Sequence, residues 1–361
     1  MLILVLNCGS SSAKYQLFHI KSKKPLAKGV VERIGEKGSG CKDHYHAARV
    51  IRDKILSGKG ACVKDASEIK GIGHRVVHGG ERFSEAVIIN KKVINSIEKF
   101  VELAPLHNPP ALAGIKACAR YFPKTPQVAV FDTAFHQTLP PYAYIYGVPY
   151  RFYEKYRVRR YGFHGTSHRY VAGEAAKRLK KPLKKLKIIT AHLGNGCSMA
   201  AVMHGRSIDT TMGLTPLEGL LMGTRSGDLD PAIVEFLIRK ERIGIKEVDN
   251  LLNRKSGFLG VSGISNDMRD IVRAIKKGKK RARLAYQIFV YRIKKYIGAY
   301  VAVMGGADAV VFTAGIGENM PALKRVLSSE LRPVLGNRTK FLMIPTNEEL
   351  TIARDTYGLI K

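Results

Sequence analysis

The chain has 361 residues, of which 45% are hydrophobic and 25% charged, so it is a globular protein long enough for two domains rather than a disordered one. Lysine and arginine outnumber aspartate and glutamate by 61 to 29, which gives a formal net charge of +32. Such a surface attracts anions, but charge alone does not choose between nucleic acid, an acidic membrane and small phosphorylated or carboxylated metabolites.

The first third of the chain predicts a hairpin, two further strands and two helices. Apolar runs bounded by glycine, serine or proline indicate strands, and apolar residues recurring every three or four positions indicate helices. In chain order we expect strands over 2–6, 14–20 and 69–77, helices over 94–103 and 111–119, and a strand over 128–131 that ends at Asp132. The proline-rich residues 104–110 separate the two helices, and residues 21–66 show no clear pattern.

The rest of the chain predicts a second set of mixed elements. In chain order we expect a helix over 167–179, strands over 187–193 and 199–204, helices over 231–240 and 282–304, strands over 309–312 and 341–344, and a helix over 347–356. Residues 140–149, rich in proline and tyrosine, are the candidate domain junction. A strand, a glycine- and serine-rich turn and a second strand occur at 2–20 and again at 187–204. This repetition suggests that each domain opens with a hairpin that faces phosphate.

The cysteines and the apolar segments limit the compartment. The five cysteines never occur as C-x-x-C and their number is odd, so we expect neither a disulfide framework nor a zinc cluster. The apolar run at the N-terminus lacks a preceding basic region, and no segment approaches the roughly 20 apolar residues that span a bilayer. We therefore expect a cytoplasmic protein that neither crosses nor binds a membrane.

Glycine-rich turns occur after three predicted strands, at 7–12, 194–196 and 315–319. Such turns expose backbone N–H groups and let a phosphate approach closely. Each alone is more often an ordinary structural turn, but three at strand ends favour a phosphate-binding protein. The P-loop pattern and the protein-kinase HRD and DFG motifs are absent from the sequence, which excludes those two classes.

Two arginines and two histidines lie among glycines. Arg75 lies in GHRVVHGG and Arg225 in MGTRSG, while His164 lies in YGFHGTSH and His192 precedes the second glycine turn. A guanidinium group suits a carboxylate or a phosphoryl group because it donates bidentately. Each of these side chains is, taken alone, as compatible with a packed structural role.

Acidic residues are scarce, which draws attention to Asp132 at a strand end and Glu348 at a helix start. A magnesium ion takes one or two protein oxygens together with phosphates and waters. From the pattern alone, however, the favoured interpretation of Glu348 is a carboxylate stabilised by the helix dipole.

Several blocks, taken together, resemble the acetokinase family of acetate kinases, within the actin, sugar-kinase and Hsp70 superfamily. The blocks are NCGSSSAK, GHRVVHGG, ELAPLHNPP, FDTAFHQTLPPYAY, YGFHGTSH, HLGNGCS, TPLEGLLMGTRSGDLDP, SGISNDMRD, FTAGIGEN and IPTNEEL. They follow the family order and extend over nearly the whole chain.

This resemblance implies a fold and a reaction. The fold would be α/β, with two duplicated ribonuclease-H-like domains and an interdomain active-site cleft. Residues 1–135 with 349–361 would form an actin-like domain closed by the C-terminal helix, and residues 136–348 would form the nucleotide-binding and dimerisation domain. The protein would be a homodimer that reversibly transfers the γ-phosphoryl group of ATP to acetate, giving acetyl phosphate and ADP, with Mg²⁺ or Mn²⁺ as cofactor.

The resemblance also implies roles for individual residues. The catalytic residues would be Arg75, Asp132, His164 and Arg225, with Asp132 orienting Arg75 or the metal waters. Arg75, Val77, Leu106, Phe163 and Pro216 would bind the acid, and Asn7 and Glu348 the metal. The nucleotide and its phosphates would contact Ser10, Ser12, Lys14, His192, Leu193, Gly194, Asn195, Gly196, Asp267, Met268, Arg269, Gly315, Ile316, Gly317, Glu318 and Asn319.

The sequence leaves other substrates and another function open, and it differs from the family pattern in charge and in two shorter regions. Propionate should be a weaker substrate, because one methylene changes binding by only ~1–3 kcal/mol, and butyrate or a pyrophosphate donor are further variants. A nucleic-acid-binding protein on a kinase-like scaffold would explain the charge, but every matched site position is occupied, so we do not expect nucleic acid as a partner.

The basic run 276–283 is interpreted as a solvated loop and helix start. Residues 37–66 and 326–340 are shorter than in the family and are expected to be surface loops.

Overall fold

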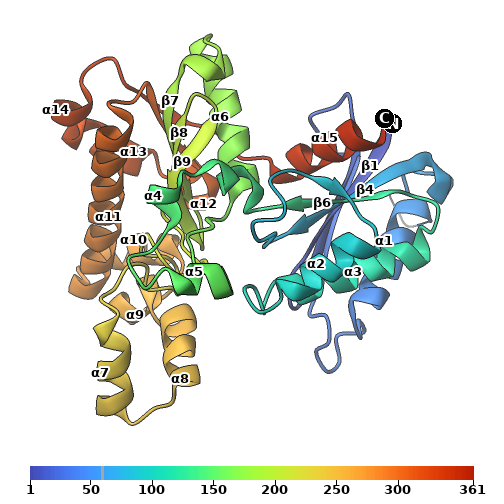
Figure 1. The fold of residues 1–361 in the computed structure, drawn as a ribbon, viewed down its shortest axis with the longest axis horizontal. Helices are drawn as coiled ribbons and strands as arrows, with labels where there is room; N and C mark the ends of the chain where they lie inside the picture. Colours follow the sequence, from blue (N-terminus) through green and yellow to red (C-terminus); the bar gives the residue numbers. More distant parts are fainter. Residues whose placement is uncertain (58–60) are drawn as a thin grey trace. The chain divides into compact units, whose positions relative to one another are not determined.

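A computed structural model describes residues 1–57 and 61–361 and divides the chain into two compact units (Figure 1). Unit 1 comprises residues 1–137 and 347–361, and unit 2 comprises residues 138–346. Residues 140–149, the candidate junction, lie inside unit 2, and the first residues of this stretch form a short helix there. Among the described residues no helix is both long and apolar enough to cross a bilayer.

Unit 1 is built around one six-stranded sheet with the order β3-β2-β1-β4-β6-β5. Its strands are β1 (Leu2–Cys8), β2 (Ser12–His19), β3 (Ala27–Glu32), β4 (Ile69–Val76), β5 (Val87–Ile88) and β6 (Gln127–Phe131), and its helices are α1 (His44–Leu56), α2 (Lys91–Lys99), α3 (Asn108–Tyr121) and α15 (Glu348–Ile360). The predicted hairpin is confirmed, because β1 and β2 pair antiparallel with Leu6 opposite Tyr15. Strands β1, β4 and β6 run parallel.

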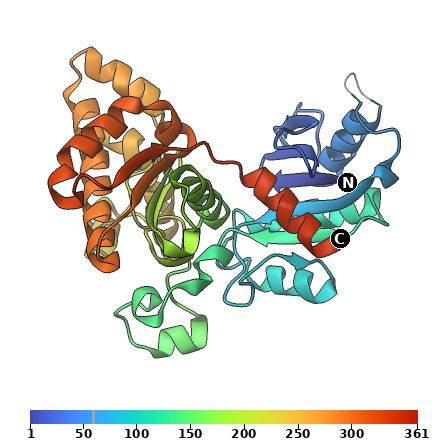
Figure 2. The same cartoon turned by 90° about the horizontal axis from the view of Figure 1, so that it is seen from above.

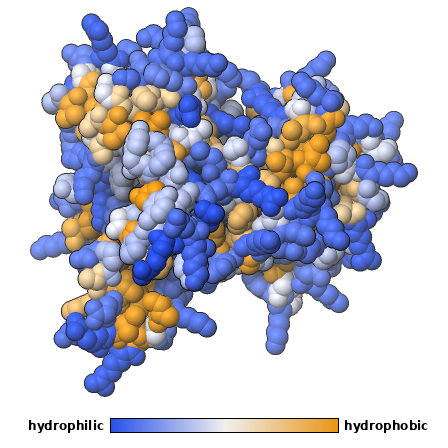
Figure 3. All heavy atoms as spheres, in the orientation of Figure 1, coloured by the Kyte–Doolittle hydropathy of each residue, from blue (hydrophilic) through white to orange (hydrophobic). Residues whose placement is uncertain are grey.

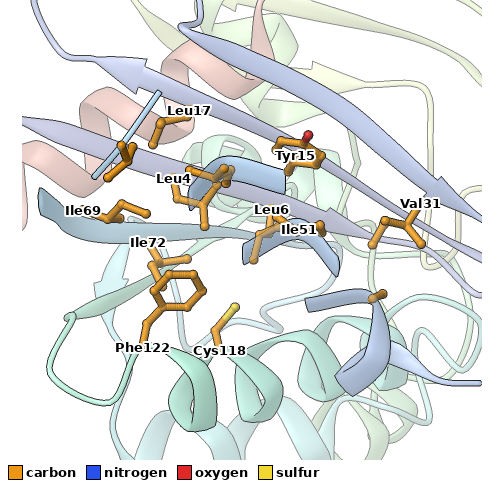
Figure 4. Packing of buried hydrophobic residues seen from close by; sticks show 14 of the residues in the cluster. Leu4, Leu6, Tyr15, Leu17, Val31, Ile51, Ile69, Ile72, Cys118 and Phe122 are labelled. Atoms are coloured by element: carbon orange, nitrogen blue, oxygen red, sulfur yellow. The ribbon is translucent and has the colours of Figure 1, made fainter. Parts of the chain in front are cut away.

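Helices cover both faces of the unit 1 sheet (Figure 2). Helices α1 and α3 pack on one face, where a hydrophobic core gathers Leu4, Leu6, Ile51, Ile72 and Phe122 (Figure 4). Helix α15 packs against β1, β4 and β6 on the other face. A Cβ atom at Gly71 would lie 2.3 Å from Ile360 Cδ1, and one at Gly73 would lie 2.6 Å from Ile352 Cγ2. Glycine at these two positions of β4 therefore permits the close approach of the C-terminal helix.

Unit 2 contains the remaining elements. Its strands are β7 (Lys187–Leu193), β8 (Cys197–Met203), β9 (Arg206–Thr210), β10 (Ala309–Thr313) and β11 (Lys340–Met343), and its helices are α4 (Pro141–Tyr144), α5 (Arg151–Tyr156), α6 (Gly165–Leu179), α7 (Ala232–Glu241), α8 (Ile245–Asn250), α9 (Gly257–Ser262), α10 (Met268–Lys276), α11 (Lys280–Met304), α12 (Ala314–Asn319), α13 (Pro321–Glu330) and α14 (Arg332–Leu335). Helices α6 and α11 cover opposite faces of its sheet (Figure 1).

The two sheets share one topology. Unit 2 has the order β9-β8-β7-β10-β11 and unit 1 has β3-β2-β1-β4-β6, so each begins with an antiparallel hairpin and adds two parallel strands beside the first strand. The predicted repetition of a hairpin at 2–20 and 187–204 is confirmed. The prediction of two duplicated α/β units is therefore correct.

Several expectations need correction. Residues 21–66, which showed no clear pattern in the sequence, contain β3 and α1. The expectation that residues 37–66 form a surface loop is wrong for residues 44–56, because these form α1. Residues 58–60 of that stretch lie outside the described residues. Residues 326–340 contain the end of α13 and all of α14 rather than a loop. The glycine turn expected at 315–319 is the short helix α12. Helix α2 ends at Lys99, four residues before the predicted end, and Pro109 and Pro110 lie inside the first turn of α3, where proline is tolerated.

Candidate active site

In unit 1, the carboxyl ends of three parallel strands carry polar side chains. Asn7 lies near the end of β1, Arg75 near the end of β4, and Asp132 directly after β6. Because parallel strands end at the same edge of a sheet, these side chains gather there. Helix α15 begins at this edge with Glu348, and the side chain of Asn347 caps the helix by accepting from Leu350 N at 3.0 Å.

Arg75 and Asp132 form a bidentate ion pair. Arg75 Nε donates to Asp132 Oδ1 at 3.0 Å and Nη2 donates to Oδ2 at 2.6 Å, while Glu348 Oε2 lies 3.7 Å from Nε. The Asp132 side chain is 1% exposed and that of Arg75 is 21% exposed. Burial alone would lower the pKa of Arg75, but the two carboxylates more than offset this and raise it. Asp132 therefore fixes a permanently charged guanidinium that is open to solvent on one side.

Glu348 is the group in this cluster whose charge is least favoured. Its pKa is raised to about 7, first by burial and then by the nearby carboxylates of Asp132 and Glu349, against the opposing effects of Arg75 and Lys14. A cation beside Glu348 would favour its ionised form. Among the described residues no group of three or more His, Cys, Asp and Glu side chains could hold a metal. The oxygens of Asn7 and Glu348 fit a magnesium ion that takes its remaining ligands from phosphates and water.

The first hairpin presents its turn beside this cluster. Gly9 N donates to Ser12 O at 2.7 Å, which closes the turn, and Ser10 is exposed at its tip. Lys14 lies opposite Asn7 in the register of β1 and β2 and is exposed. The turn thus offers hydroxyls and one ammonium group at the edge where Arg75 and Glu348 lie.

In unit 2, two histidine rings and one arginine meet at the end of β7. The rings of His164 and His192 stack with centroids 4.1 Å apart and an interplanar angle of 17°. Gly196 lies beside both His164 and Arg225, since a Cβ atom at Gly196 would lie 3.4 Å from His164 Cε1 and 3.5 Å from Arg225 Nη1. The imidazole of His164 and the guanidinium of Arg225 thus both lie next to Gly196.

Arg225 differs from Arg75 in having no acidic partner among the described residues. Its Nη1 donates to Pro216 O at 3.3 Å. Burial lowers the pKa of Arg225, because desolvation disfavours the charged guanidinium, and only a small opposing effect comes from Cys197. A half-buried guanidinium without an acidic partner attracts an anionic ligand.

His164 is held in an uncommon backbone conformation. Its φ of 55° lies in the left-handed region, and it caps the N-terminus of α6. Such a conformation is costly for a residue with a Cβ atom and concentrates at functional sites. Its Nδ1 lies 2.9 Å from Ser198 Oγ, which fixes the ring plane.

A cavity of about 620 Å³ lies in unit 2. It is lined by Gly194, Asn195, Asn266, Asp267, Met268, Arg269, Gly315, Ile316, Asn319 and Met320. Three segments predicted to bind nucleotide, which lie more than forty residues apart in the chain, thus border one cavity. Asp267 caps α10 by accepting from Arg269 N at 2.8 Å, and hydrogen bonds from Arg269 lower the pKa of Asp267 to about 2.

Some predicted nucleotide-binding residues lie outside the cavity lining. Leu193 and Gly317 are buried in the fold. Glu318 turns its carboxylate toward the backbone, where Oε1 accepts from Ala314 N at 2.8 Å and Thr346 N at 3.0 Å. It holds the start of α12 against the segment that leads to α15.

The four residues expected around the methyl group of the acid are divided between the units. Val77 is half-buried and Leu106 is 51% exposed in unit 1. In unit 2, Phe163 is 1% exposed and Pro216 lies beside Arg225.

Two kinds of residue were not predicted from the sequence. Asn266 and Met320 border the cavity, and the only signal for them was their position next to recognised blocks. Ser198 and His168 bond to each other at 2.8 Å beside His164. Residue type alone did not point to these two, because their role depends on which side chains meet across α6 and β8.

Comparison with known proteins places the chain among close relatives. A family model described as the acetokinase family matches residues 2–339. A protein of Halothermothrix orenii named acetate kinase is 54% identical over a 397-residue alignment that covers all of both chains. The crystal structure of Porphyromonas gingivalis acetate kinase shares 43% identity, with a TM-score of 0.94 over the whole of both chains, and that of a propionate kinase from Francisella tularensis shares 41% identity, with a TM-score of 0.92 over 99% of each.

Proposed function

Since the chain belongs to the acetokinase family, we propose that it is an acetate kinase, which reversibly transfers the γ-phosphoryl group of ATP to acetate. The observation that carries this proposal is the cavity in unit 2, bordered by three separate segments of the kind expected to bind nucleotide. Its volume of about 620 Å³ is in the range of small-molecule sites. ATP is therefore favoured over pyrophosphate as the donor.

Phosphoryl transfer depends on positioning and charge neutralisation more than on covalent chemistry with the protein. Both the acid and the γ-phosphate are anions, so their mutual repulsion must be offset. In this proposal Arg75 binds the carboxylate of the acid, Arg225 binds the transferring phosphoryl group, and His164 donates to its oxygens in the transition state. Asp132 orients Arg75 through the bidentate ion pair.

Asn7 and Glu348 would hold Mg²⁺, which supplies positive charge to the phosphates when bound. Ser10, Ser12 and Lys14 of the first hairpin would bind the phosphates. Acetate is already a carboxylate at neutral pH, so no residue needs to act as a general base. The acid would be short, and propionate a weaker substrate, because one methylene is worth only ~1–3 kcal/mol.

The protein should act as a cytoplasmic homodimer formed through unit 2. Helix α7 has no buried residue, and Ile233 and Phe236 are 40% and 49% exposed. Hydrophobic surface is visible over α7 and α8 (Figure 3). A second copy of the chain would cover this face, since a monomer rarely leaves a helix with so many apolar residues in water. The free cysteines fit a reducing compartment.

A hydroxamate assay of acyl phosphate formation tests the function. Magnesium and ATP are supplied with acetate, propionate or butyrate in parallel, and Arg225→Ala serves as the inactive control. Product from acetate that is lost in the control supports the proposal. No product from any acid, with the protein folded and nucleotide bound, would overturn it.

A further inference from the structure

A chain of buried hydrogen bonds in unit 2 ends at His164. Thr190 Oγ1 lies 3.4 Å from the carbonyl oxygen of Ala200, and His168 Nδ1 lies 2.7 Å from Thr190 Oγ1. His168 Nε2 then lies 2.8 Å from Ser198 Oγ, which lies 2.9 Å from His164 Nδ1. Three side chains, one each from β7, α6 and β8, thus connect a backbone carbonyl to the imidazole of His164, the residue that precedes α6.

The carbonyl of Ala200 sets the direction of the chain, because it can only accept a hydrogen bond. The Thr190 hydroxyl donates to this carbonyl, so it accepts from His168 Nδ1–H. A neutral His168 that is protonated at Nδ1 has a bare Nε2, which accepts from the Ser198 hydroxyl. Since Ser198 has only one hydrogen to donate, it accepts from Nδ1–H of His164.

Burial stabilises this assignment of donors and acceptors along the hydrogen-bond chain. Thr190, His168 and Ser198 are each 0% exposed, so water does not compete for their hydrogen bonds. Burying a charged His168 would be costly, which favours its neutral form. Reversing one bond would force the others to reverse or leave a buried polar atom without a partner.

We infer that His168 and Ser198 are positioning residues that fix neutral His164 as its Nδ1–H tautomer, so that Nε2 is the nitrogen that gains and releases a proton. The functional part of this inference rests on the proposed role of His164 at the transferring phosphoryl group. Nε2 then donates to a phosphoryl oxygen only when it carries that proton. The tautomer itself is a property of the free protein and holds whatever the substrate is.

The test is a long-range ¹⁵N–¹H correlation spectrum of the full-length protein labelled with [¹⁵N]histidine, recorded without ligands at a pH where the ring is neutral. His164→Asn identifies the signals of His164. The expected pattern is a protonated Nδ1 and a bare Nε2. A His164 ring with a bare Nδ1 and a protonated Nε2 overturns the inference.

Thr190→Val and Thr190→Ser form a matched pair for the direction of the chain. Valine keeps the shape of threonine and removes the hydroxyl, so His168 Nδ1–H loses its acceptor. The donor-to-acceptor direction of the remaining hydrogen bonds is then no longer fixed. We expect His164 to shift toward a mixture of tautomers in Thr190→Val and to remain Nδ1–H in Thr190→Ser. An unchanged His164 pattern in Thr190→Val overturns the inference. If that variant does not fold, Ser198→Ala carries the same test with the same two outcomes.

Kinetics separate positioning from a general structural role. In Ser198→Ala we expect kcat to fall by about ten- to a hundredfold, the scale seen when a hydrogen-bond partner that orients a working histidine is removed, with KM for ATP within about twofold. Equal losses in kcat and in ATP affinity would indicate a merely structural role. Because the spectra need no substrate, failure of the tautomer assignment is distinguishable from failure of the acetate kinase assignment.

Discussion

The guanidinium of Arg75 donates to both carboxylate oxygens of Asp132, whose side chain is almost fully buried at the end of β6. The pair joins the ends of two neighbouring parallel strands. An arginine held in this way presents its remaining N–H groups in a fixed direction, which is what recognition of a small carboxylate requires.

Asp132→Asn should lower kcat/KM for acetate by up to about a hundredfold, because a misdirected Arg75 no longer aligns the acid. The matched control is Asp53→Asn, which removes an exposed carboxylate of the same unit that pairs with Arg52 and should leave turnover unchanged. Steady-state kinetics with varied acetate provide the measurement. Near-normal turnover in Asp132→Asn would remove any essential role for the ion pair.

Glu348→Gln should raise the magnesium concentration needed for half-maximal activity by about tenfold or more, because an amide is a weaker ligand for a hard cation than a carboxylate. Glu349→Gln makes the same change of charge one residue further along α15 and should have little effect. Titrating magnesium at fixed ATP compares the two variants. If they respond alike, Glu348 acts only through its charge and is not a ligand.

Much of this arrangement could be predicted because its signals are local. The two hairpins follow from short apolar runs and glycine turns, and the duplicated topology follows from their repetition. Helix α1 was missed because only Ala47, Ala48, Ile51 and Ile55 of its thirteen residues are buried, and its polar remainder hides the helical period. Two sets of hydrogen bonds were not predicted: those that Glu318 accepts from Ala314 N and Thr346 N, called the Glu318 clasp below, and those that link Thr190 to His164. Both depend on tertiary contacts between segments distant in the sequence.

His74 gives a prediction for the pH dependence of stability. Burial lowers the pKa of His74 from 6.5 to about 4. The folded ring therefore stays neutral while the unfolded ring takes up a proton below pH 6.5. Its contribution is fully present above pH 6.5 and is lost as the pH falls toward 4, by about 3 kcal/mol in total.

Urea unfolding of the wild type and of His74→Gln between pH 8 and pH 4 measures this contribution. The wild type should lose stability faster than His74→Gln as the pH falls, because only the wild type carries the buried imidazole of His74, while the other buried histidines are common to both proteins. His204→Asn, at an exposed histidine, should follow the wild-type slope. Parallel curves for the wild type and His74→Gln would contradict the prediction.

Glu318→Ala should weaken the nucleotide site although the carboxylate is not part of the cavity lining. Ala314 has a φ of 63° and its N–H is held by Glu318, as is that of Thr346. Removing the carboxylate deprives two N–H groups of their acceptor at a cost of ~1–3 kcal/mol each, and it releases the strained start of α12, whose Gly315 and Ile316 border the cavity. We expect the Kd for ADP to rise about tenfold, equivalent to ~1.4 kcal/mol, with a lower urea midpoint.

Glu318→Gln retains an acceptor oxygen, so its ADP affinity and its urea midpoint should both fall less than those of Glu318→Ala. Calorimetric titration with ADP, together with urea unfolding, compares the two variants, and wild-type affinity in Glu318→Ala would show that α12 keeps its position without the clasp.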